Sequence, residues 1–149
     1  MAQTFTRAHA ETVAAVLKRL PYIKEVVLFG SIAQKGSGRD IDLALVVPTP
    51  FVMRFNMLIA EELQKKGMTA ETRDETVISQ VFEEAAIEVL GEGLRHLLKA
   101  AKALLPPHED PSLDLILVPY EWRVVAPQIR KLGPAEDRHW GDIERGVVL

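Results

Sequence analysis

The stretch VVLFGS at residues 26–31, followed after eight residues by DID at residues 40–42, decides the fold that this sequence predicts. The four apolar residues predict a buried strand, and Gly30-Ser31 predicts a tight turn into a short helix over about residues 31–35. A second strand is expected over about residues 40–47, where the side chains alternate between two faces. The core of the prediction is therefore a pair of strands joined by a turn, a short helix and a loop.

This strand pair places acidic and glycine residues close together. Asp40 and Asp42 are expected on one face of the second strand, with Cα atoms roughly 6.5 Å apart. Two neighbouring carboxylates repel each other unless a cation lies between them, and magnesium prefers hard oxygen ligands of this kind. Gly30 lets the backbone approach a phosphate closely, and the helix that starts at Ser31 points free N–H groups towards it. One half of the expected site suits a triphosphate and the other half suits its metal ions.

The spacing of these residues resembles the signature of a known superfamily. Four apolar residues, Gly-Ser, eight residues and Asp-x-Asp resemble the motif of the nucleotidyltransferases that include DNA polymerase β, and most of all their minimal prokaryotic members. The resemblance covers about residues 24–47, with a weaker echo near residue 114. It implies an α+β fold in which a small mixed β-sheet packs with helices. The alternative interpretation is a turn, a helix cap and two solvated aspartates on an edge strand.

The resemblance also implies the role of each site residue. Asp40 and Asp42 would hold two magnesium ions, and Asp114 would complete the catalytic one. Gly30 and Ser31 would bind the β- and γ-phosphates of a nucleoside triphosphate, with ATP favoured. Two metal ions about 3.5–4 Å apart can stabilise both the attacking and the leaving oxygen of such a transfer.

The phosphate-binding cation is left open by the sequence. Many relatives carry arginine where Gln34 stands, and the nearest cations here are Lys35 and Arg39. Both are therefore candidate nucleotide-binding residues.

The third carboxylate has two candidates. Chain order favours Glu71, in a strand over residues 68–72 directly after the helix expected over about residues 49–67. Strand quality favours Asp114, because Leu113, Leu115 and Leu117 alternate onto a packing face while Asp114 opens the other. A buried aspartate is costly unless it is paired or metal-bound. We therefore predict Asp114, with an aspartate reaching solvent at a strand end as the alternative.

The remaining chain is predicted to form one domain over residues 1–149, with a helical insertion over about residues 68–107 and a C-terminal tail over about residues 134–149. We expect helices over about residues 7–20, 49–67, 72–90, 94–105 and 120–132, and a strand over about residues 113–118. Thr49 and Thr72 are the expected N-caps of the second and third helices, and Pro127 is expected to kink the last. The tail either docks on the body or stays loose.

Composition sets wider limits. The chain has 149 residues, a formal net charge of −3, 48% hydrophobic residues and no cysteine. These values indicate a soluble globular protein, exclude thiolate metal sites and disulfides, and fit a reducing cytoplasm. The charge argues against a protein that wraps nucleic acid along its surface, and no apolar run approaches a membrane span. The four histidines, at positions 9, 96, 108 and 139, show no ligand spacing and are predicted to be surface or packing residues.

Two functions of different classes follow. The first is a magnesium-dependent nucleotidyltransferase that moves a nucleoside monophosphate, with AMP favoured, onto an acceptor hydroxyl. Many minimal relatives act on a partner protein, and the resemblance implies a small helical HEPN-type toxin as that partner. The second is a non-catalytic module that keeps the fold and binds a nucleotide or a partner.

Overall fold

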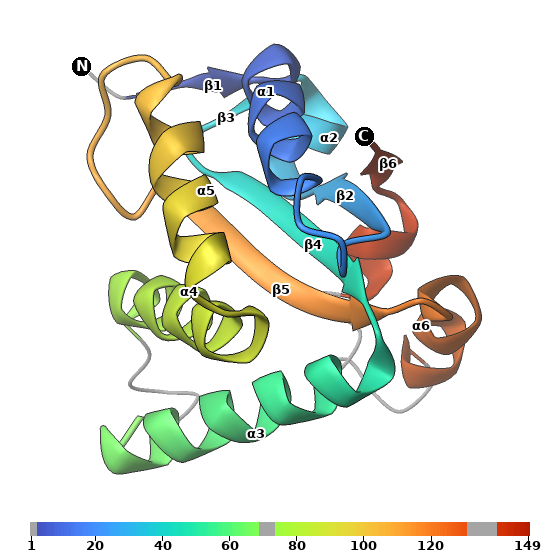
Figure 1. The fold of residues 1–149 in the computed structure, drawn as a ribbon. Coiled ribbons are helices and arrows are strands. Elements are labelled where there is room, and N and C mark those ends of the chain that lie inside the picture. The colour runs from blue at the N-terminus through green and yellow to red at the C-terminus, as the bar shows by residue number, and fades with distance from the viewer. Residues whose placement is uncertain (1–2, 69–73, 131–139) are drawn as a thin grey trace.

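The computed structural model describes residues 3–68, 74–130 and 140–149, which form a mixed α+β fold. Helices cover a four-stranded sheet with the strand order β5-β4-β2-β6, and β1 and β3 form a separate two-stranded sheet (Figure 1). The elements are β1 (Phe5–Thr6), α1 (Arg7–Leu17), β2 (Glu25–Phe29), α2 (Gly30–Lys35), β3 (Ser37–Gly38), β4 (Ile41–Val47), α3 (Thr49–Lys65), α4 (Glu75–Leu90), α5 (Glu92–Ala103), β5 (Leu113–Pro119), α6 (Trp122–Arg130) and β6 (Val147–Val148). The predicted α+β class and mixed sheet are confirmed.

Strand direction in the large sheet follows from the connections. β2 and β4 run antiparallel and are joined through α2 and β3, whereas β4 and β5 run parallel and are joined through α3, α4 and α5. A parallel pair requires such a long crossover, because the chain must return from the end of the first strand to the end of the sheet at which that strand began. β6 pairs antiparallel with the free edge of β2.

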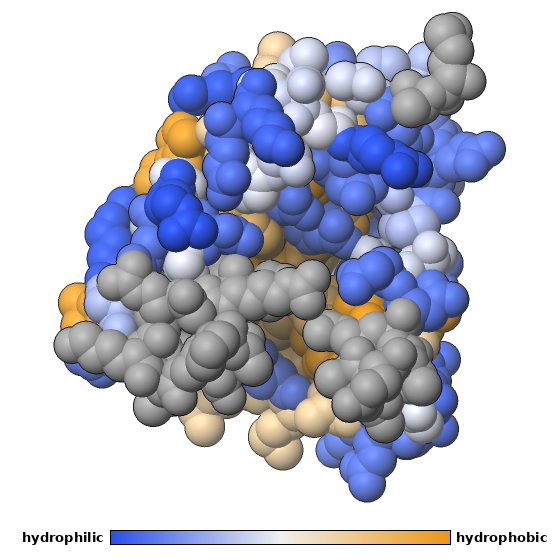
Figure 2. Space-filling model, turned by 180° about the vertical axis from the view of Figure 1, so that it is seen from behind, coloured by the Kyte–Doolittle hydropathy of each residue, from blue (hydrophilic) through white to orange (hydrophobic). Residues whose placement is uncertain are grey.

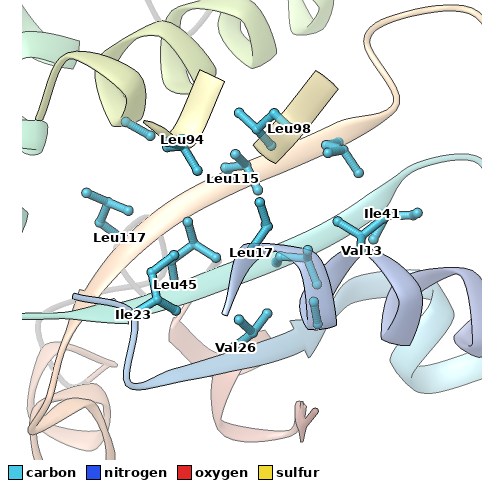
Figure 3. Packing of buried hydrophobic residues seen from close by; sticks show 14 of the residues in the cluster. Val13, Leu17, Ile23, Val26, Ile41, Leu45, Leu94, Leu98, Leu115 and Leu117 are labelled. Atoms are coloured by element: carbon cyan, nitrogen blue, oxygen red, sulfur yellow. The ribbon is translucent and has the colours of Figure 1, made fainter. Parts of the chain in front are cut away.

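The larger hydrophobic core lies on one face of this sheet. Ile41, Leu45 and Leu115 project from the strands towards Leu17 of α1 and Leu98 of α5 (Figure 3). Each of these five side chains is at most 2% exposed. At about 25 cal/mol per Å² of apolar surface removed from water, such burial is the main contribution to stability. Because α5 supplies part of this core, the segment predicted as an insertion is packed into the body of the fold.

A second, smaller core covers the opposite face of the sheet. Ala44 and Val46 of β4 lie there, packed with Val27 of β2, Trp122 of α6 and Ile143 of the C-terminal segment. A strand buried on both faces carries a nearly continuous apolar sequence, which explains why every residue of β4 after Asp42 is apolar. Asp42 belongs to this second face, two residues before Ala44.

Several predicted boundaries are corrected by the structure. β4 begins at Ile41, so Asp40 stands in the bend before the strand. Thr49 is already inside α3, whose N-cap is Pro48. The cap of α4 is Asp74, whose carboxylate accepts hydrogen bonds from two backbone N–H groups, while Thr72 lies outside the described residues. Short polar side chains next to a helix start compete for the cap position, and sequence spacing alone did not separate them.

The C-terminal segment docks on the body. Residues 147–148 form β6, and the Leu149 N–H donates to the carbonyl of Val26 at 2.9 Å. Ile143, in the short helical segment over residues 140–144, is fully buried. Of the two alternatives for the tail, docking is therefore correct for its last ten residues.

The helices in the described parts of the chain include none with both the length and the apolar character needed to cross a membrane.

Candidate functional site

Asp42 and Asp114 lie side by side on neighbouring strands. They are register partners in the parallel pair of β4 and β5, and both are partly buried. Neighbouring strands are about 4.8 Å apart, and partners in register project from the same face. The fold therefore brings together two carboxylates that are far apart in the sequence.

The pKa of Asp42 is raised by these surroundings. Burial raises it first, followed by the hydrogen bond to Asp114 and by repulsion from Asp114, Asp40 and Asp142, so that it reaches about 8. A carboxyl group with such a pKa holds a proton at neutral pH in the metal-free protein. The pair is thus arranged to share a proton or to bind a cation.

Asp40 lies next to this pair, on the side exposed to solvent. Its pKa is raised, chiefly by partial removal from water and then by the negative charge of Asp114, and Arg39 opposes the shift. Asp40 lies within electrostatic reach of Asp114, but its own side chain is more exposed because it precedes the strand. The three predicted carboxylates therefore converge on one end of β4 and β5.

Gly30 lies against the Asp42 carboxylate. Its φ of +76° belongs to the left-handed region, and a Cβ atom built on it would be 2.1 Å from Asp42 Oδ2. Both the backbone conformation and the available space thus require glycine at this position. The turn that the sequence predicts to bind phosphate is in direct contact with the predicted metal ligand.

The other predicted nucleotide-binding residues lie at different distances along the chain from this turn, and the structure places each of them separately. Ser31 is exposed at the start of α2 and lies above Gly38, where an added Cβ would be 3.1 Å from Ser31 Cβ. Lys35 is exposed at the C-terminal end of α2. Arg39 is exposed beside Asp40 and lines a cleft that Lys35 does not reach.

That cleft opens next to the carboxylates. It has a volume of about 1070 Å³, and Asp40, Asp114 and Arg39 are in its wall. Its other lining residues come from the N-terminus, from the first turns of α4 and from the loop before β5, and they are Gln3, Glu75, Thr76, Ser79, Pro107, His108, Glu109, Asp110 and Pro111. On the side opposite to the view of Figure 1, hydrophilic residues cover most of the coloured surface, and hydrophobic residues show between them near the centre (Figure 2). A molecule entering the cleft therefore reaches Asp114 directly.

Two residues near the carboxylates were not predicted. Ser79 of α4 donates a hydrogen bond from Oγ to Asp114 Oδ1. Asp142 lies close enough to contribute to the raised pKa of Asp42, and its carboxylate is paired with Arg145 at 2.8 Å. Neither stands near a recognisable motif, and only the long-range packing of α4 and of the C-terminal segment brings them to the site. The competing candidate Glu71 lies outside the described residues.

The donor atoms at the site fit magnesium better than a softer metal. Among the residues that the structure describes, no group of three or more His, Cys, Asp or Glu side chains is arranged to hold a metal ion. Magnesium does not require one, since proteins usually bind it through one or two carboxylates, with water and phosphate oxygens completing the octahedron. The close pair of Asp42 and Asp114 offers such a partial set. The predicted binding of two ions, with Asp40 as a further ligand, stays a prediction.

The histidines within the described residues have other contacts. The rings of His9 and His108 meet Phe5 edge-on, with centroids 5.9 and 5.7 Å away, and His96 is exposed.

A separate hollow of about 690 Å³ lies between α3, α4 and α5, and none of the predicted site residues lines it.

Comparison of the chain with models of known protein families, with curated proteins and with solved structures gave no match.

Proposed function

We propose that this protein is a magnesium-dependent nucleotidyltransferase that moves a nucleoside monophosphate, with AMP favoured by the sequence resemblance, from a nucleoside triphosphate to an acceptor hydroxyl. One observation carries the proposal: the register-paired carboxylates of Asp42 and Asp114 lie beside a glycine turn that leaves no room for a side chain. A metal-binding pair next to an open backbone is what a triphosphate with its counter-ions requires.

The proposed reaction is a displacement at the α-phosphorus. The acceptor hydroxyl oxygen forms the new bond to the α-phosphorus, the bond from that phosphorus to the bridging oxygen breaks, and pyrophosphate leaves with the bridging electrons. Bound magnesium would supply charge neutralisation for the phosphate oxygens. Asp42 and Asp114 hold the cation, and the hydroxyl proton passes to an ionised carboxylate of the site or to water.

In this proposal the triphosphate and the acceptor bind on different sides of the carboxylates. The triphosphate lies along Gly30 and Ser31, whereas the acceptor enters through the cleft in whose wall Asp114 and Asp40 stand. Of the two candidate cations, Arg39 shares that wall with Asp40 and Asp114, and Lys35 does not. The acceptor class proposed from the resemblance is a partner protein of the small helical HEPN type.

The second candidate function is a non-catalytic nucleotide- or partner-binding module. It is favoured by Gln34, an exposed residue at a position where many members of the resembled family carry arginine, because a cation there would stabilise phosphate charge in the transition state.

The test is to incubate the protein with MgCl₂, each of the four α-³²P-labelled ribonucleoside triphosphates, and HEPN-type proteins as acceptors, with Asp42→Asn as the matched control. Transfer of label by the wild type alone supports the enzyme. Magnesium-dependent triphosphate binding without transfer or pyrophosphate release favours the binding module. If magnesium has no effect on triphosphate binding, the proposal is wrong.

A further inference from the structure

Ser79 of α4 contacts the carboxylate pair through Asp114 and has no part in the proposed reaction. It lies in the second turn of α4, is partly buried, and lines the same cleft as Asp114. Its hydroxyl donates to Asp114 Oδ1 across 35 positions of sequence. A serine in a helix commonly turns its hydroxyl back to the carbonyl four residues earlier, so the direction of this bond is a specific feature of the fold.

The position of Ser79 is fixed by its helix. Its neighbours Ile78 and Val81 are buried, and α4 packs along β5 and against α3 and α5. The packing of α4 thus fixes the backbone of Ser79 beside Asp114, whose Oδ1 accepts the hydroxyl hydrogen bond. Ser79 therefore restricts the orientation of Asp114.

That restriction bears on cation binding. Ser79 engages Oδ1 of Asp114, and Asp114 is also hydrogen-bonded to Asp42. A cation shared by the two carboxylates would take the place of the proton in that second hydrogen bond. Groups that hydrogen-bond to metal ligands orient them, and their loss typically lowers metal affinity or activity by about 10–100-fold.

We propose that Ser79 is a positioning residue that orients the Asp114 carboxylate for the divalent cation. This inference rests on the proposed function, because it takes Asp114 to be a metal ligand. It adds that α4, in the segment predicted as a helical insertion, contributes to the site through this hydroxyl.

The test uses Mn²⁺ alone as the probe, with the free ion measured by electron paramagnetic resonance. Ser79→Ala is expected to weaken Mn²⁺ binding by about 10-fold or more, and Ser79→Thr, which keeps the hydroxyl, to bind within a few-fold of wild type. Thr76→Val is the matched control, because it removes a hydroxyl one turn earlier in the same cleft and should leave affinity unchanged. In Asp114→Asn, adding Ser79→Ala should cause no further loss, since the two residues act through one contact.

A merely structural role for Ser79 gives a different result. In that case Ser79→Ala lowers the melting temperature of the metal-free protein but leaves Mn²⁺ affinity at the wild-type value, and the inference is overturned. If the wild type itself binds no Mn²⁺, the proposed function fails and this inference fails with it. Wild-type binding that Ser79→Ala leaves intact overturns the role of Ser79 alone.

Discussion

Asp42 carries most of the electrostatic cost of this site. It is partly buried, it lies beside Asp114 in register, and its carboxylate touches the backbone of Gly30. A group in these surroundings destabilises the fold when it is ionised and unpaired, and it stabilises a complex when a cation arrives. Such a balance is typical of functional sites, where local stability is lower than the fold could otherwise reach.

The first prediction concerns the pH dependence of stability. The folded pKa of Asp42, about 8, lies above the usual value of 3.8, so between these values the folded state binds more protons than the unfolded state. The contribution of Asp42 to stability is therefore present below about pH 4 and is lost as the pH rises towards 8. Chemical denaturation of the metal-free protein should show Asp42→Asn increasingly more stable than wild type over that range. A constant difference would contradict the raised pKa.

The second prediction concerns Gly30. In Gly30→Ala the new side chain must adopt a left-handed backbone and displace the Asp42 carboxylate, whereas Gly36→Ala has a similar φ of +86° with nothing within 4 Å of the added Cβ. Gly36→Ala should cost only the conformational term, about 1–2 kcal/mol. Gly30→Ala should lose more stability and should also lose the rise in melting temperature that magnesium gives the wild type. Equal losses in both variants would show that Asp42 does not press on Gly30.

At the scale of elements, the predicted strands were found because their signals are local. The apolar run of β2, the alternation in β5 and the Gly-Ser turn each depend on neighbours in sequence, and the match of Asp42 with Asp114 followed once both strands were placed. The two-residue strands β1, β3 and β6 are too short for a periodic pattern. The contacts of Ser79 and Asp142 depend on how distant elements pack, which no local spacing encodes.

The third prediction concerns the C-terminal segment. Ile143→Ala removes a fully buried side chain from the core on the second face of the sheet and should cost about 2–5 kcal/mol in the free energy of unfolding. Val148→Ala, in β6, is the control, because Val148 is 43% exposed and its loss should cost far less. Urea denaturation measures both. A small effect of Ile143→Ala would mean that this segment is not part of the folded body.

At the scale of the whole molecule, two hydrophobic cores of unequal size pack against opposite faces of the four-stranded sheet. The candidate site lies where β4 and β5 begin. The larger core fixes the strands through α1 and α5, while α6 and the C-terminal segment close the other face. Ligand sites gain precision when they are built on such rigid elements. At this end of the sheet Asp40 and Asp114 stand in the wall of the cleft.

The fourth prediction follows from ligand linkage. Magnesium together with a nucleoside triphosphate should raise the melting temperature of the wild type more than either alone, because each binds the folded state and the phosphates share the cation. Ser31→Ala should reduce the additional shift given by the triphosphate while keeping the shift given by magnesium. Loss of one hydrogen bond to a charged group costs about 1.5–3 kcal/mol. Differential scanning fluorimetry with unchanged shifts in Ser31→Ala would return Ser31 to a purely structural role.

The most direct test of the central claim is anomalous X-ray scattering from crystals grown with Mn²⁺ and a nucleoside triphosphate whose α,β-bridging oxygen is replaced by methylene. The account predicts a manganese peak bridging the carboxylates of Asp42 and Asp114, with the triphosphate along Gly30 and Ser31. A manganese peak elsewhere, or a nucleotide bound in the hollow between α3, α4 and α5, would contradict it.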